Sequence, residues 1–286
     1  MPLALVTGGT AGIGAAFADQ LASDGHDLVL VARGADRLEA AAADLHRRHG
    51  ISVETLRADL TDPAGRAAVE ARLTTPDLPP VDVLVSNAGV QVAKEFLDAD
   101  LASLQTEVDV NVSGVLRMTH LALRGMVGRG HGSVILVSSF AGILPARGSA
   151  YGASRAWAVA LADTLAPSLE GTGVRITVVC PGFVRTDSVE GIPDTAAFRQ
   201  GFLLLSPAQV ARRALADHHF GRTTSVPGLA YRSVWTWLEL PRRALRASAR
   251  LARRDRSHVA AARAADPVVP APRRAGSSPV DRQPTP

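Results

Sequence analysis

A glycine-rich stretch near the amino terminus has the residue types and the spacing of a phosphate-binding turn. Gly8, Gly12 and Gly14 follow an apolar run, Leu3 to Val6, and apolar residues recur at helical spacing from Ile13 onward. Glycine permits positive φ and close backbone approach, and the start of a helix points unpaired N–H groups at a ligand. A phosphate suits that position. The spacing lacks the Gly-Lys-Ser/Thr ending of a P-loop, so it predicts a dinucleotide site and disfavours a nucleoside triphosphate.

The second predicted strand is followed by a cation. The Leu and Val run from Asp27 to Val31 is typical of a strand buried on both faces, and Arg33 comes directly after its end. In dinucleotide folds this strand end meets the adenosine ribose, where a carboxylate would hold a 2′-hydroxyl and an arginine would accept a 2′-phosphate. Arg33 therefore favours NADP over NAD. The alternative is a solvated arginine at a helix start, because Asp36 and Arg37 follow closely.

Strand and helix patterns alternate along most of the chain. Four such alternations precede residue 90, with the third strand ending at Asp59 and the fourth running into Asn87-Ala88-Gly89. Open parallel sheets bind ligands at this carboxyl edge. Later strands are predicted over residues 133–138, 174–179 and 223–226, which makes about seven. The order predicts an α/β fold with a Rossmann-like, doubly wound parallel sheet between two helical layers, in one domain.

The charge of the chain is concentrated at its carboxyl end. Residues 1–240 hold 20 basic and 24 acidic side chains, whereas residues 241–286 hold 11 and 3. We therefore expect a folded domain over 1–240 and a basic extension over 241–286 that is partly helical, then disordered. A basic helix predicts weak contact with an anionic membrane. No nucleic-acid partner is predicted, because an aromatic stacking platform and a recognition motif are both missing.

The number of cysteines indicates the redox state of the compartment in which the protein is found. Cys180 has no second cysteine to pair with inside the chain, and the first strand begins directly at the amino terminus. A disulfide framework and a signal peptide are therefore not expected, and a reducing cytoplasm is predicted. No metal site is predicted.

Five motifs together resemble the short-chain dehydrogenase/reductase family over about residues 1–230. The first is the glycine-rich turn Thr7-Gly8-x3-Gly12-x-Gly14, and the others are Asn87-Ala88-Gly89, Asn111, the Ser139 and Tyr151 pair, and Pro181-Gly182 with Thr186. By itself Asn111 would be a satisfied core residue within the helix predicted over 101–126. The resemblance is to NADP-preferring members that carry a C-terminal extension. Because the five motifs occur in the family's order and spacing, a glycine-rich turn that binds no ligand is the less favoured interpretation.

The resemblance implies an enzyme that interconverts a carbonyl and an alcohol by hydride transfer with NADP. Tyr151 would donate the proton, Ser139 would hold the substrate oxygen, and Asn111 and Arg155 would complete the catalytic group. Asp59 would bond the adenine amino group. The residues that would surround the cofactor are Gly8, Thr10, Gly12, Ile13, Gly14, Arg33, Asp59, Leu60, Asn87, Ala88, Gly89, Tyr151, Arg155, Pro181, Gly182, Val184 and Thr186.

Two positions depart from the family pattern. Counting back from Tyr151 by the usual spacing gives Ser138 as the catalytic serine, whereas the Ser-x-Ala-Gly match gives Ser139; we choose Ser139 and infer a loop one residue short. Arg155 stands where the family has lysine. It keeps the positive charge one helical turn from Tyr151 but cannot pass on a proton. A catalytically impaired sensor or scaffold of the same fold is therefore the alternative to a working enzyme.

The substrate and the assembly are predicted less directly. Residues 187–205 carry apolar side chains without a clear period, which predicts a flap over an apolar substrate. The resemblance implies a homodimer or homotetramer packed through the helices around Asn111 and Tyr151, with Trp157 as an interface residue.

Overall fold

The computed structural model describes residues 1–144, 150–186 and 203–239. Most of the flap predicted over 187–205 and all of the extension predicted over 241–286 lie outside these residues. Residues Met1–Leu240 form one compact unit. No helix among the described residues has the length and apolar character needed to cross a membrane.

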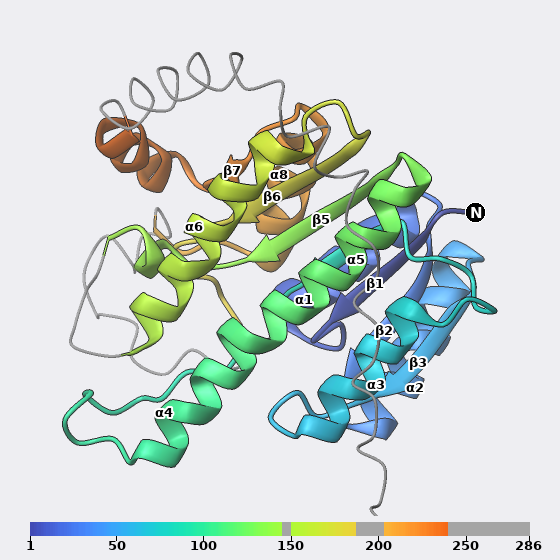
Figure 1. Cartoon of the computed structure of the whole chain (residues 1–286), viewed down its shortest axis with the longest axis horizontal. Coiled ribbons are helices and arrows are strands. Elements are labelled where there is room, and N and C mark those ends of the chain that lie inside the picture. Colours follow the sequence, from blue (N-terminus) through green and yellow to red (C-terminus); the bar gives the residue numbers. More distant parts are fainter. Residues whose placement is uncertain (145–149, 187–202, 240–286) are drawn as a thin grey trace, which may run out of the picture. The chain divides into compact units, whose positions relative to one another are not determined.

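A seven-stranded parallel sheet forms the centre of this unit, in the order β3-β2-β1-β4-β5-β6-β7 (Figure 1). The prediction of a doubly wound parallel sheet is confirmed. The strands are β1 (Leu3–Thr7), β2 (Asp27–Ala32), β3 (Val53–Arg57), β4 (Val83–Ser86), β5 (Gly132–Val137), β6 (Val174–Val179) and β7 (Thr224–Ser225). The chain order reverses between β1 and β4, so their carboxyl ends flank the switch point at which such sheets bind ligands.

Helices cover both faces of the sheet (Figure 1). Contacts join α1 to α2 and α8 in one layer, whereas α3 contacts α5, and α4 contacts α6. The bounds are α1 (Gly12–Ser23), α2 (Ala35–His49), α3 (Pro63–Thr74), α4 (Leu101–Val108), α5 (Val115–Arg129), α6 (Ala150–Leu169) and α8 (Pro207–His219). A further helix spans residues 229–239. Strands buried on both faces explain why β1, β2 and β4 appear in the sequence as continuous apolar runs.

The helix predicted over 101–126 is divided in the structure. A π-helical turn, Asp109–Gly114, lies between α4 and α5 and contains Asn111. Single π turns inside α-helices are frequent at functional sites. In the last helix, Tyr231 and Trp235 are buried, whereas Val234 and Leu238 are each 43 % exposed.

Candidate functional site

The glycine-rich turn leaves the start of α1 open to a ligand. Gly8 and Gly12 have φ of 69° and 53°, in the left-handed region that favours glycine. A Cβ at Gly14 would overlap the carbonyl oxygen of Gly8, so the helix and the turn approach each other closely. The residue before the helix, Ala11, supplies no side-chain cap, and the first turn holds no acidic residue. The first N–H groups of α1 therefore remain available to an anion.

A buried threonine joins this turn to the segment that follows β4. The Thr7 hydroxyl accepts hydrogen bonds from the backbone N–H groups of Asn87 at 2.9 Å and Ala88 at 3.0 Å. The Asn87 side-chain amide in turn donates to the Thr7 carbonyl oxygen at 2.9 Å. These bonds fix the ends of β1 and β4 side by side at the switch point. Sequence reasoning did not assign Thr7 a role, although it directly precedes the first glycine.

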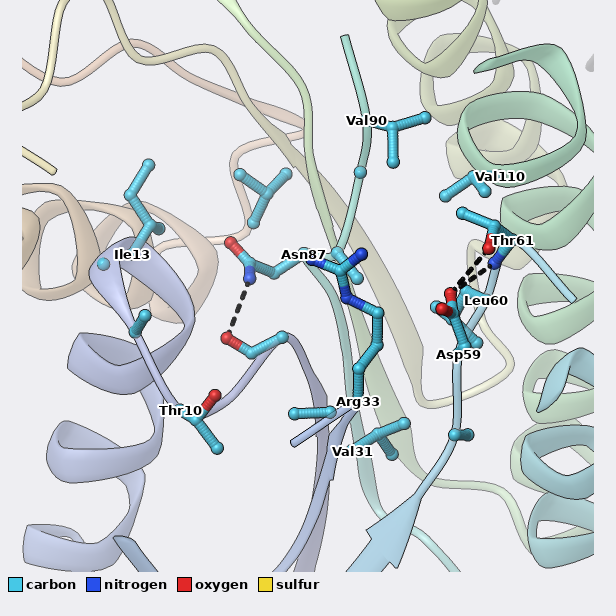
Figure 2. Close-up of a pocket in the computed structure, with 18 of the residues that line it drawn as sticks. Thr10, Ile13, Val31, Arg33, Asp59, Leu60, Thr61, Asn87, Val90 and Val110 are labelled. Carbon is cyan, nitrogen blue, oxygen red and sulfur yellow. Dashed lines mark hydrogen bonds between the residues drawn. The ribbon is translucent and has the colours of Figure 1, made fainter. Parts of the chain in front are cut away.

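Two arginines and an aspartate line the side of the site beside β2. Figure 2 shows Arg33 extending into the pocket between Asn87 and Asp59. Asp59 accepts hydrogen bonds from the Thr61 backbone N–H at 2.9 Å and hydroxyl at 2.8 Å. These bonds, with a smaller contribution from the Arg33 charge, hold the pKa of Asp59 below its usual range. Arg37, in the first turn of α2, lines the same pocket and was missed as a candidate.

The π turn holds Asn111 against the segment after β4. The Asn111 side chain is 1 % exposed; its oxygen accepts from the Val90 N–H at 3.0 Å and its amide donates to the Val90 carbonyl at 2.7 Å. The same amide approaches the Ser154 hydroxyl at 3.2 Å. Asn111 thus connects the segment after β4 to α6, which carries Tyr151 and Arg155.

A buried carboxylate one turn earlier makes a parallel connection. Glu107 is fully buried, accepts a hydrogen bond from the Val92 N–H at 2.8 Å and lies 3.4 Å from the Ser154 hydroxyl. The Ser154 hydroxyl also approaches the Tyr151 carbonyl oxygen at 2.9 Å. Glu107 was not predicted from the sequence. It fixes the same two segments as Asn111 from a position four residues earlier.

Arg155 is buried beside Tyr151 at the inner end of the pocket. Its side chain is only 7 % exposed, and its guanidinium carbon lies 4.9 Å from the centroid of the Tyr151 ring, in cation–π contact. One guanidinium nitrogen donates to the Val137 carbonyl at 3.2 Å, whereas Nε is buried without a partner. A Cβ at Gly89 would overlap the guanidinium, so glycine there makes room for it. The site thus holds a buried cation with an unused donor.

The two candidate serines differ in what their hydroxyl groups do. The buried Ser138 hydroxyl donates to the Arg155 carbonyl oxygen at 2.8 Å, which joins β5 to α6. Ser139 is half-buried, and its oxygen accepts from the Ala141 N–H at 3.2 Å, at the start of a short 3₁₀ turn. Accepting leaves the Ser139 proton available to a substrate oxygen. In this geometry Ser138 has a structural partner and Ser139 keeps a free donor.

The segment after β6 closes the opposite side of the site. Pro181 accepts a hydrogen bond through its carbonyl oxygen from the Phe140 N–H at 2.8 Å. Gly182 lies beneath the Tyr231 ring, which a Cβ at this position would overlap. Val184 is buried and forms an isolated β-bridge with Leu205. These contacts direct the segment toward the start of α1.

These segments enclose a cavity of about 450 Å³ at the carboxyl edge of the sheet. Predicted residues that line it are Gly8, Thr10, Gly12, Ile13, Arg33, Asp59, Leu60, Asn87, Ala88, Gly89, Tyr151, Arg155 and Thr186. Predicted residues that lie outside its lining are Gly14, Asn111, Ser139, Pro181, Gly182 and Val184, whereas Ser138, the alternative to Ser139, lines it. Within the described ranges, no group of three or more His, Cys, Asp or Glu side chains is placed to hold a metal ion.

Comparisons with known proteins match this architecture. The short chain dehydrogenase family model matches residues 2–197. The chain is 36 % identical to NADP-dependent 3-hydroxy acid dehydrogenase YdfG of Salmonella typhi, over 64 % of this chain and 72 % of that protein. It is also 36 % identical to glycine betaine reductase ATRR of Emericella nidulans, but over 73 % of this chain and 17 % of that longer protein.

A solved structure extends the comparison to three dimensions. The short-chain dehydrogenase from Sphingobium yanoikuyae in complex with NADPH is similar with a TM-score of 0.77 and 30 % identity. The similarity covers 86 % of this chain and 96 % of that one. The seven-stranded parallel sheet agrees with this similarity. The chain belongs to the short-chain dehydrogenase family.

Proposed function

We propose that this protein is an NADP(H)-dependent oxidoreductase that interconverts a carbonyl and an alcohol on an apolar substrate. The observation that carries the proposal is the buried Arg155 guanidinium in contact with the Tyr151 ring, at the inner end of a cavity that begins at a phosphate-binding turn. A proton donor and a cation beside a dinucleotide groove are the chemistry that reduction of a carbonyl requires.

The residues of the cavity fit NADP in three places. The uncapped first turn of α1 offers N–H groups to the pyrophosphate. Arg33 and Arg37 offer two guanidinium groups to the 2′-phosphate. The unpartnered Nε of Arg155 offers a donor to an acceptor such as a ribose hydroxyl. Proteins similar to this chain are named as NADP-dependent or were solved with NADPH, which supports the same cofactor.

The catalytic roles follow from the chemistry of the side chains. Bound NADPH supplies a hydride to the carbonyl carbon. Tyr151 donates its phenolic proton to the carbonyl oxygen, and the Ser139 hydroxyl donates a hydrogen bond to that oxygen as negative charge develops on it. Arg155 stabilises the negative charge left on the Tyr151 oxygen, while Asn111 and Glu107 hold α6 and the segment after β4 in register.

An apolar substrate is supported by the side chains around the Ser139 and Pro181 segments. Leu144 is 47 % exposed at the end of the first segment, and Phe183 is 41 % exposed in the second. The predicted flap over residues 187–205 is part of the same proposal, and its residues up to 202 lie outside the described ranges.

The alternative is a dinucleotide-binding sensor or scaffold with impaired chemistry. It is favoured by one contact: the Arg155 guanidinium is held on the Val137 carbonyl, and a guanidinium does not release a proton at physiological pH. The two functions are separated by measuring NADPH oxidation against a panel of aldehydes and ketones. Turnover that Tyr151→Phe abolishes supports the enzyme. Tight NADPH binding without turnover on any of the panel supports the sensor.

A homo-oligomer is part of the proposal. Val108 at the end of α4 and Leu116 at the start of α5 are 38 % and 47 % exposed, and eight residues separate them across the π turn. Exposed apolar side chains repeated along one helical rod are typical of helix pairing between subunits. Light scattering of the purified chain tests the expectation of a dimer or tetramer.

A further inference from the structure

The phenol of Tyr231 joins two segments at the border of the proposed active site. Tyr231 lies on the helix over residues 229–239, and its side chain is buried. Its hydroxyl donates a hydrogen bond to the Leu203 carbonyl at 2.7 Å and accepts one from the Phe183 N–H at 3.1 Å. Burial, partly offset by the bond from Phe183, raises the pKa of this phenol. The phenol therefore keeps the proton that it donates at neutral pH.

The Tyr231 ring contacts a third segment, which carries Ser139. It meets the Phe140 ring edge-on, with the centroids 5.1 Å apart, and Phe140 directly follows Ser139 in the chain. The Phe140 N–H also donates to the Pro181 carbonyl at 2.8 Å. A Cβ at Gly182 would overlap the Tyr231 ring, so the ring and this backbone are in close contact. One side chain thus touches both the segment after β5 and the segment after β6.

A short backbone ladder extends the effect of the Tyr231 hydroxyl. The Arg185 N–H donates to the Leu205 carbonyl at 2.8 Å, and the Leu205 N–H donates to the Phe183 carbonyl at 2.9 Å. These bonds join the segment after β6 to the segment before α8. The Tyr231 hydroxyl bonds one residue of each segment, Phe183 and Leu203, and so connects the whole ladder to its own helix.

The order of the strands places these segments at one end of the cavity. β2 and β3, which precede Arg33 and Asp59, lie on one side of β1, whereas β4, β5 and β6 lie on the other (Figure 1). If Arg33 binds the 2′-phosphate of the adenosine half, the nicotinamide half extends toward β5 and β6. Thr186, three residues after Phe183, lines the cavity, and a Cβ at Gly12 would come within 3.0 Å of its methyl group. The segment from Phe183 to Thr186 therefore reaches the cavity from the nicotinamide side.

We propose that Tyr231 is a positioning residue for the nicotinamide half of the cofactor. Its hydroxyl holds the backbone at Phe183, and its ring holds the Ser139 segment through Phe140. It thereby fixes the segment that borders the nicotinamide relative to the proposed donor to the substrate oxygen. The family match ends at residue 197 and does not include Tyr231. The inference rests on the NADP(H) cofactor of the proposed function.

Binding of two ligands to the full chain tests the proposal without relying on turnover. NADPH carries both halves of the cofactor, whereas adenosine 2′,5′-bisphosphate carries the adenosine half and no nicotinamide. Tyr231→Phe keeps the ring and removes both hydrogen bonds of the hydroxyl. It should weaken NADPH binding about five- to tenfold and change the affinity for the bisphosphate by less than about twofold.

The matched control is Ser233→Ala, which removes a hydroxyl group from the exposed side of the same helix. The Ser233 hydroxyl donates to the Leu229 carbonyl at 3.0 Å and contacts neither segment of the ladder. This variant should bind both ligands as wild type does. Urea unfolding checks that both variants are folded. The fluorescence of bound NADPH, which arises from the reduced nicotinamide, should move toward that of free NADPH in Tyr231→Phe and stay unchanged in the control.

Three results would overturn the proposal. Unchanged NADPH binding by Tyr231→Phe would show that the ring alone matters, and equal weakening of both ligands would show a general loosening of the fold. Wild type that binds neither ligand would overturn this inference together with the proposed cofactor. Because none of these measurements involves turnover, failure to reduce any carbonyl compound counts against the proposed activity alone, and the two failures are distinguishable.

Discussion

The guanidinium carbon of Arg155 lies 4.9 Å from the centroid of the Tyr151 ring, one helical turn along α6. A cation at this distance interacts with the face of the ring and stabilises negative charge on the phenolic oxygen. The guanidinium is also tied to the Val137 carbonyl and packed against Gly89, so its position is fixed from three sides. Arg155 therefore keeps a positive charge beside Tyr151, but its guanidinium cannot pass on a proton.

The first prediction concerns this pair. Arg155→Lys should match or exceed the turnover of wild type, because an ammonium supplies the same charge and can exchange a proton. Tyr151→Phe should lower turnover by about 10² to 10⁴, since it removes the proton donor. Both are measured as NADPH oxidation on one carbonyl substrate, with the free energy of unfolding in urea as the folding control. A wild type without turnover that lysine alone restores would favour the sensor.

The second prediction concerns cofactor choice. Arg33→Ala should weaken NADP binding about 10- to 100-fold and leave NAD binding nearly unchanged, because charge-assisted hydrogen bonds to the 2′-phosphate are lost. Arg37→Ala should act in the same direction, and the double variant should lose most of the preference. Arg47→Ala, on the exposed side of α2, is the matched control. Titration of both cofactors by calorimetry is the measurement. A preference that survives both substitutions would make these arginines ordinary surface residues.

The third prediction separates the two adjacent serines. Ser139→Ala should lower kcat without changing stability, because its free donor is aimed at the substrate oxygen in the proposal. Ser138→Ala should destabilise the fold by about 1 to 3 kcal/mol, since the buried Arg155 carbonyl loses its partner. Urea unfolding and steady-state kinetics on both variants are compared. The opposite pattern, with kinetics lost only in a stable Ser138→Ala, would reverse the assignment.

The fourth prediction is a dependence of stability on pH that arises at His218. Its ring is nearly buried between the hydroxyls of Thr177 and Ser133, each at 2.8 Å, and burial, followed by the charge of Arg175, lowers its pKa from 6.5 to about 4. The unfolded chain then binds a proton that the folded chain does not between these values. Stability should therefore fall by about 3 kcal/mol as the pH drops from about 6.5 to 4.

Urea unfolding at several pH values checks the slope. His218→Gln should be less stable than wild type at neutral pH, but it should lose less stability on acidification because it has no proton to bind. His120→Gln, at an exposed position on α5, should keep the wild-type slope. Equal slopes in wild type and His218→Gln would show that carboxylates alone account for the acid sensitivity.

The features that could be predicted from the sequence are those encoded by residues close together in the chain. Strands buried on both faces leave continuous apolar runs in the sequence. Glu107 could not be found this way, because the Val92 N–H and the Ser154 hydroxyl come from segments that only tertiary folding brings to it. The π turn at Asn111 could not be predicted either, because no hydrophobic period in the sequence distinguishes it from the α-helices on either side.

Exposure is the other property that helical spacing could not supply. Helical spacing relates four apolar residues, Tyr231, Val234, Trp235 and Leu238, but the structure buries only the two aromatic residues among them. Which apolar residues pack depends on the width of the surface that receives the helix, here the segments around Phe140 and Phe183. Arg37 was missed for a related reason, because only the folded structure shows that its side chain lines the pocket.

The contact of Gly182 with the Tyr231 ring links two parts of the chain that are nearly fifty residues apart. Any side chain at position 182 would displace the ring, and displacing the ring would remove the hydroxyl that bonds Phe183 and Leu203. Positions 182 and 231 are therefore constrained to change together. In chimeras between members of the family, the block from Pro181 to residue 239 should be exchanged as a single unit, because a junction inside it would combine a loop from one parent with a helix shaped for another.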